Sequence, residues 1–159
     1  MRPQQISRGP IVTGLELVSD GPLKDDLTAY YTLESKGDWE KTYNYRSVTF
    51  RRTIPYETYK LWMDQDSRGW ALIKVEILEQ SVEYDSNIDE EVTFINIAFT
   101  DEIMDVDAII ERNWSRSYQN GKQYKTVNRT IWAHREEAWT CLDCGRRLHM
   151  TFNARFTMK

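Results

Sequence analysis

Apolar and polar residues alternate without a break near the end of the chain, from Leu148 to Met158. A period of two is the repeat of a β-strand, whose successive side chains point to opposite faces of a sheet. All of the apolar residues fall on one face and all of the polar residues on the other. The pattern therefore predicts a half-buried strand over Leu148–Met158.

Shorter runs of β-branched, aromatic and alternating residues predict further strands. The tripeptide Asp85-Ser86-Asn87 separates two of them and is typical of a turn, so we expect those two strands to form an antiparallel pair. Cys141 and Cys144 flank another predicted turn, at Leu142-Asp143. The predicted strands are Ile11–Val18 with a break at Gly14, Thr28–Glu34, Tyr43–Ile54, Trp70–Tyr84, Val92–Phe99 and Arg129–Thr140.

Two segments have helical patterns. Pro55 suits the first turn of a helix, and we expect that helix over residues 56–65. Thr100 is a good N-cap for a second helix over residues 101–113, with two acidic residues in its first turn. The apolar residues of the second segment follow helical 3-4-4 spacing: Ile103, Val106, Ile110 and Trp114.

These elements predict an α+β fold made mainly of antiparallel sheet, with six to eight strands and two short helices. A length of 159 residues is typical of a single domain, which we place at residues 11–159. Residues 1–10 contain Pro3, Gly9 and Pro10 and predict a flexible N-terminal arm.

The sequence predicts that the protein is found in the cytoplasm or in a virion. The sequence contains no apolar run that approaches the roughly 20 residues of a membrane span. The first ten residues lack the apolar core of a signal peptide, so we expect no secretion by that route. The sequence has only two cysteines, which is too few for a disulfide framework.

Negative and positive charges are separated along the chain. Residues 1–106 hold 11 basic and 20 acidic residues, a net charge of −9, whereas residues 107–159 hold 10 basic and 5 acidic residues, a net charge of +5. Like charges that are crowded in one folded region repel each other, so we expect each half to meet opposite charge.

The acidic residues are densest between Val75 and Glu111, where twelve carboxylates occur without any lysine or arginine. The interpretations are a solvated face balanced by the basic half, a surface that repels or mimics nucleic acid, and a divalent-metal site. The predicted acidic surface comprises Glu76, Glu79, Glu83, Asp85, Asp89, Glu90, Glu91, Asp101, Glu102, Asp105 and Asp107.

The basic residues of the C-terminal part predict a second surface, because several of them share the polar face of the predicted last strand. Aromatic residues lie between them in sequence, and this combination suits phosphate contact and base stacking. Charge-complementary packing against the acidic residues is the favoured interpretation, ahead of nucleic-acid binding. The predicted basic surface comprises Arg129, Arg135, Arg146, Arg147, His149 and Arg155.

The sequence Cys141-Leu142-Asp143-Cys144-Gly145 resembles the knuckle of zinc ribbons and rubredoxin-like sites. Zinc takes four ligands, and the two further ones would be His134 and His149, the only histidines in the sequence. With a hairpin turn between the cysteines, His149 lies roughly 17 Å along the strand from Cys144. The favoured interpretation is therefore a pair of cysteines at a turn, without a cofactor.

With two histidines and no recognised catalytic motif, the sequence predicts a protein that is not an enzyme. We expect an interaction or assembly protein that oligomerises through complementary acidic and basic surfaces. Its size and charge separation would suit a small structural or connector protein of a phage. The alternatives are an acidic, nucleic-acid-mimicking inhibitor of a DNA- or RNA-binding enzyme, and a zinc-dependent nucleic-acid-binding protein.

Overall fold

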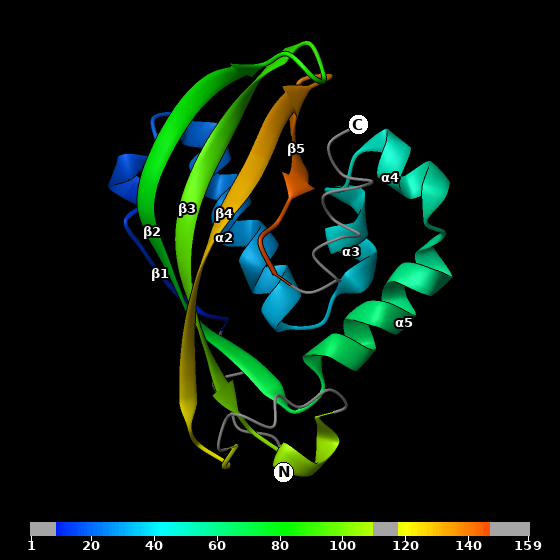
Figure 1. Cartoon of the computed structure of the whole chain (residues 1–159), viewed down its shortest axis with the longest axis vertical. Helices are drawn as coiled ribbons and strands as arrows, with labels where there is room; N and C mark the ends of the chain where they lie inside the picture. Colours follow the sequence, from blue (N-terminus) through cyan, green and yellow to red (C-terminus); the bar gives the residue numbers. More distant parts are fainter. Residues whose placement is uncertain (1–8, 110–117, 147–159) are drawn as a thin grey trace.

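Residues 9–109 and 118–146 are described in the computed structural model, and five strands form one sheet within them (Figure 1). The strands follow one another across the sheet in sequence order. The first pair is parallel and the other pairs are antiparallel. The strands are β1 (Ile11–Thr13), β2 (Trp70–Asp85), β3 (Glu90–Ile103), β4 (Gln123–Arg135) and β5 (Ala138–Asp143).

The α+β class is as predicted, but the numbers of strands and helices are not. The predicted antiparallel sheet of six to eight strands is wrong, because the described sheet is mixed and has five strands. Four α-helices replace the predicted two within these ranges. They are α2 (Gly21–Ser35), α3 (Trp39–Asn44), α4 (Val48–Thr53) and α5 (Tyr56–Ser67).

Helix α2 contains the residues that were predicted as the strand Thr28–Glu34. The Asp20 side chain accepts a hydrogen bond from the Leu23 backbone N–H at 2.9 Å, and Pro22 lies in the first turn, so the start of the helix is well capped. The buried residues recur at helical spacing: Leu23, Leu27, Tyr30, Tyr31 and Glu34. Their burial on one helix face outweighs the strand preference of the local threonines and tyrosines.

The predicted strand Tyr43–Ile54 is also wrong, because helices α3 and α4 occupy this segment. The Asp38 side chain caps α3, and the Ser47 side chain accepts a hydrogen bond from the Phe50 N–H at the start of α4. The predicted helix over residues 56–65 is confirmed as α5, which follows Pro55 directly.

Strands β2 and β3 form the predicted antiparallel pair, but β3 continues to Ile103. The predicted helix over residues 101–113 is therefore wrong in its first turn. A short 3-10 helix, η2 (Val106–Ala108), follows, and residues 110–117 lie outside the described ranges. Similarly, the predicted strand Ile11–Val18 is reduced to β1 and the 3-10 helix η1 (Leu15–Leu17).

Strands β4 and β5 form a hairpin whose turn lies at Glu136 and Glu137, both with positive φ, and not at Leu142-Asp143 as predicted. The predicted strand Arg129–Thr140 is thus two strands. The predicted strand Leu148–Met158 and most of the predicted N-terminal arm lie outside the described residues.

The main core lies between α2 and the face of the sheet that α2 covers (Figure 1). Residues of α2 pack there against buried residues of β2, β3, β4 and β5. A second cluster joins Trp39, Phe50, Tyr59 and Met63 of the helices α3, α4 and α5. In the ranges described, none of the helices has both the length and the apolar character to cross a membrane.

Candidate functional site

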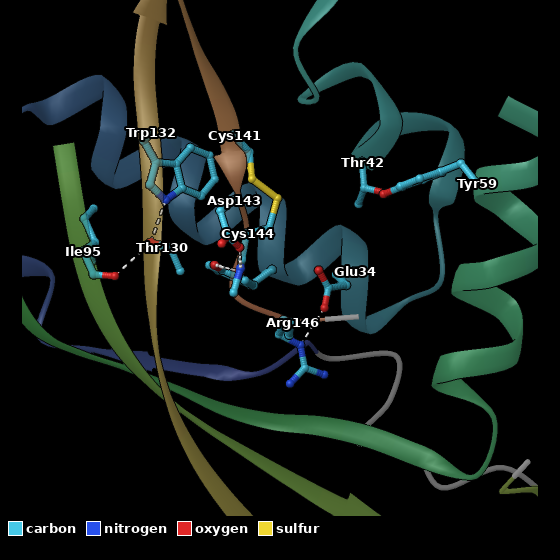
Figure 2. The surroundings of a disulfide bond; sticks show 12 residues. Glu34, Thr42, Tyr59, Ile95, Thr130, Trp132, Cys141, Asp143, Cys144 and Arg146 are labelled. Atoms are coloured by element: carbon cyan, nitrogen blue, oxygen red, sulfur yellow. Dashed lines mark hydrogen bonds and ion pairs between the residues drawn. A yellow bond between two sulfur atoms is a disulfide. The ribbon is translucent and has the colours of Figure 1, made fainter. Parts of the chain in front are cut away.

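Arg146 lies at the centre of a buried ion-pair cluster that joins the end of the described chain to α2 and β3. Its NH1 and NH2 groups donate to the two carboxylate oxygens of Asp101, each at 2.7 Å, and its Nε donates to Glu34 Oε1 at 2.6 Å. Figure 2 shows Glu34 and Arg146 side by side below the disulfide. Burial alone lowers the pKa of Arg146, but the two carboxylates outweigh it and raise that pKa.

Tyrosines and a second arginine surround this cluster. Arg46 is buried and lies over the rings of Phe50 and Tyr59, at 4.9 and 5.8 Å from their centroids. Burial followed by the charge of Glu34 raises the pKa of Tyr30 and of Tyr31 well above the usual range. Two guanidinium groups thus accompany the carboxylates Glu34 and Asp101, which balances the buried charge.

The two cysteines of the predicted zinc knuckle form a disulfide in the structure, with their Cα atoms 5.7 Å apart (Figure 2). Both are buried, and the Cys144 carbonyl accepts a hydrogen bond from the Tyr31 hydroxyl at 2.8 Å. Zinc binds thiolates, so these sulfurs could act as ligands only after reduction.

The predicted histidine ligands do not join the cysteines in the described structure. His134 is exposed on β4, with its ring 5.2 Å from that of Trp139, and His149 lies outside the described residues. Within residues 9–109 and 118–146, no group of three or more potential metal-ligating side chains comes together.

The predicted acidic surface is divided into several places. Three of its carboxylates pair with basic residues of the C-terminal part: Glu76 with Lys125, Glu90 with Arg135, and Asp101 with Arg146. Three others have different local roles. Glu79 accepts a hydrogen bond from Asn96, Glu102 accepts one from Gln123, and Asp105 accepts one from the Asp107 backbone N–H.

Four of the remaining predicted acids, Glu83, Asp85, Asp89 and Glu91, gather at one end of the sheet, where the β2–β3 and β4–β5 turns lie side by side (Figure 1). The fifth, Asp107, lies in η2. Contacts between Arg135 and Glu90 join the two hairpins there, including hydrogen bonds from Arg135 Nε at 3.0 and 3.1 Å. We call this region the acidic end. Its carboxylates are Glu83, Asp85, Asp89, Glu90, Glu91, Glu136 and Glu137.

Sequence reasoning missed Glu136 and Glu137, because they belong to the basic half of the chain. The available signal was the run Arg135-Glu136-Glu137, where the strand alternation is lost. In the described part of the chain, Arg135–Glu90 is the ion pair at the acidic end, and the other six carboxylates form none.

The predicted basic surface is likewise only partly described. Arg135 and Arg146 are engaged in the ion pairs above, and the guanidinium of Arg129 lies 4.3 Å from the ring centroid of Phe94. Arg147, His149 and Arg155 lie outside the described residues.

The edge of β2 beside the acidic end has no neighbouring strand among the described residues. β1 pairs with β2 only from Lys74 to Glu76, whereas β2 continues to Asp85. Val82 and Tyr84 are 49% and 63% exposed on this part of β2. An open backbone edge with exposed apolar side chains is a template for another strand.

No protein-family model matches the chain. A segment of 85 residues is 27% identical to gamma-glutamyl phosphate reductase 2 of Synechocystis sp., and it covers 53% of this chain. The chain spans 20% of the length of that relative, whose name is that of an enzyme.

Proposed function

We propose that this protein is a non-enzymatic interaction and assembly protein that uses the acidic end to bind a cationic protein surface. The observation that carries the proposal is the gathering of seven carboxylates at two adjacent turns, beside the open edge of β2. The preferred partner is a second copy of the chain, since residues 107–159 carry a net charge of +5.

The buried ion-pair cluster supports a structural role for the other conspicuous charges. The Arg146 side chain is 6% exposed and that of Glu34 is 1% exposed, and each group already pairs with another. A substrate would have to displace these ion pairs, and leaving a buried charge without its partner is costly. The exposed carboxylates of the acidic end are accessible without any such displacement.

Light scattering of the full chain at about 0.1 M and about 1 M salt tests the proposal, because the Debye length falls from about 10 Å to about 3 Å over this range. We expect association at low salt that weakens at high salt. The double variant Glu83→Lys/Asp85→Lys should remain monomeric under both conditions.

A matched control is Glu40→Lys/Glu57→Lys, which makes the same change in net charge on exposed residues of α3 and α5. The control should associate like the wild type. A strict monomer at low salt and high concentration, or equal behaviour of the two double variants, would overturn the proposal.

A further inference from the structure

The open edge of β2 begins where the chain before α2 turns away from the sheet. β1 ends at Thr13, and Gly14, at φ 80°, approaches the Ile77 carbonyl so closely that a Cβ atom would overlap it. The 3-10 helix η1 then leads to α2. From Glu79 to Asp85, β2 therefore pairs on one side only, with β3, among the described residues.

The side chains on this edge differ between the two faces of the sheet. Gln80 is opposite the buried Ile95, so the period of two places Val82 and Tyr84 on the same face as Ile95. Glu83 and Asp85 lie on the other face. A strand that pairs here would need apolar side chains on one face and cationic side chains on the other.

The last thirteen residues of the sequence, 147–159, have this character. Their apolar positions are Leu148, Met150, Phe152, Ala154, Phe156 and Met158, and the alternate positions include Arg147, His149 and Arg155. Ser19, just before α2, exchanges hydrogen bonds with the Gln80 side chain at 3.1 and 3.0 Å, so the edge that is open begins at Ser81. Resting on the proposed function, we infer that the β2 edge from Ser81 to Asp85 binds residues 147–159 of a second copy as an added strand. One of its arginines would lie beside Glu83 and Asp85, because Arg147 and Arg155 are eight residues apart and the two carboxylates only two. Its apolar face would lie beside Val82 and Tyr84.

Pairing within one chain would use only the last part of the segment. Gly145 lies against β4, where its carbonyl accepts a hydrogen bond from Asn128 Nδ2 at 2.7 Å. The open edge is on the far side of β3 and β2, and α2 fills the core face between them. Crossing three strands takes roughly 15–20 Å, or about five or six extended residues, which leaves about seven residues to pair and takes Arg147 into the crossing. Pairing within one chain would leave the protein monomeric, so light scattering of the wild type distinguishes it from pairing between two copies.

Direct pairing of two β2 edges is also disfavoured, because it would place the carboxylates of one copy beside those of the other. A C-terminal segment carries the opposite charge and the same alternation. The complementary pairing is reciprocal, since each copy has one edge and one segment, and it can therefore close a dimer.

A charge-swap experiment on the full chain tests this inference. Glu83→Lys/Asp85→Lys reverses the edge, and Arg147→Glu/Arg155→Glu reverses the segment. Each variant alone should lose association by at least about tenfold, because like charges then face each other. An equimolar mixture should regain a dimer containing one chain of each kind, which native mass spectrometry would identify by mass.

Circular dichroism is used to test whether each variant is folded, and Glu40→Lys/Glu57→Lys again serves as the charge-matched control. If Arg147→Glu/Arg155→Glu associates like the wild type while Glu83→Lys/Asp85→Lys does not, the inference is overturned and the proposed function stands. If neither the wild type nor the mixture associates, both fail. A mixture that stays monomeric while the wild type is a dimer overturns the inference alone.

Discussion

Arg146 and Asp101 form a bidentate ion pair although 45 residues separate them in the sequence. Asp101 is on β3 and is 8% exposed, and Arg146 follows β5 at the end of the described chain. Such planar pairing has defined geometry as well as favourable energy. The pair, together with Glu34 of α2, holds Arg146 against both β3 and α2.

Replacing Arg146 with methionine should destabilise the fold strongly. The substitution leaves the buried carboxylates Glu34 and Asp101 without their cation, and the expected loss in the free energy of unfolding is about 3–5 kcal/mol. Urea denaturation followed by circular dichroism measures this loss. Arg135→Met is the matched control, because its side chain is 27% exposed and its pair with Glu90 should contribute less than about 1 kcal/mol. Equal losses for the two variants would refute the structural role of Arg146.

The Arg146–Asp101 pair also explains why the sequence was misread at this point. Thr100, Asp101 and Glu102 have the composition of a capped helix start, and the apolar spacing that follows is helical. The structure instead buries Asp101 within β3, where a distant arginine compensates its charge. Neither composition nor periodicity reveals a partner 45 residues away, so the local signal was outweighed by a tertiary ion pair.

The β2–β3 hairpin and α5 could be predicted because their signals are local. Asp85-Ser86-Asn87 marks the hairpin turn, and Pro55 marks the start of α5. The turn at Glu136 and Glu137 has no glycine or asparagine, although both residues adopt positive φ. The acidic end could therefore not be predicted from the sequence, because it depends on the position of this turn beside the β2–β3 hairpin in the folded protein.

Stability should fall at alkaline pH because of the buried tyrosines. Burial, followed by the charge of Asp26, raises the pKa of Tyr45 from 10.0 to about 12, and burial also raises the pKa of Tyr30 and of Tyr31. The unfolded chain loses these phenol protons near pH 10 while the folded chain keeps them, so folding is disfavoured progressively as the pH rises above 10. Circular dichroism and phenolate absorbance should therefore change together.

Tyr45→Phe provides the comparison for this prediction. It removes one phenol that titrates between pH 10 and 12, so the free energy of unfolding should fall less steeply with pH over that interval. Tyr84→Phe removes an exposed phenol at the acidic end and serves as the control. The range from pH 9 to pH 12 includes the usual pKa of tyrosine, about 10. A free energy of unfolding of the wild type that stays constant over this range would contradict the raised pKa of the buried tyrosines.

The disulfide should be present in the folded protein and should contribute modestly to its stability. A thiol reagent should detect no free cysteine in denaturant unless a reductant is added, because Cys141 and Cys144 are joined. The loop that they close is short, so reduction should lower the free energy of unfolding by about 2 kcal/mol on the loop-entropy scale. Two reactive thiols per chain without reductant would disprove the disulfide bond. Zinc binding should be measured on the reduced protein, because only that form has free thiols.

Gly14 should be far less replaceable than Gly121, although both have positive φ, 80° and 84° respectively. A Cβ atom at Gly14 would overlap the Ile77 carbonyl, whereas nothing lies within 4 Å of one at Gly121. Gly121→Ala should therefore cost only the left-handed backbone strain, about 1 kcal/mol. Gly14→Ala adds a steric conflict with β2, and we expect a loss at least about 1 kcal/mol larger in urea denaturation. If the two substitutions cost the same, β1 can move away from β2, and the open edge of β2 would begin before Glu79.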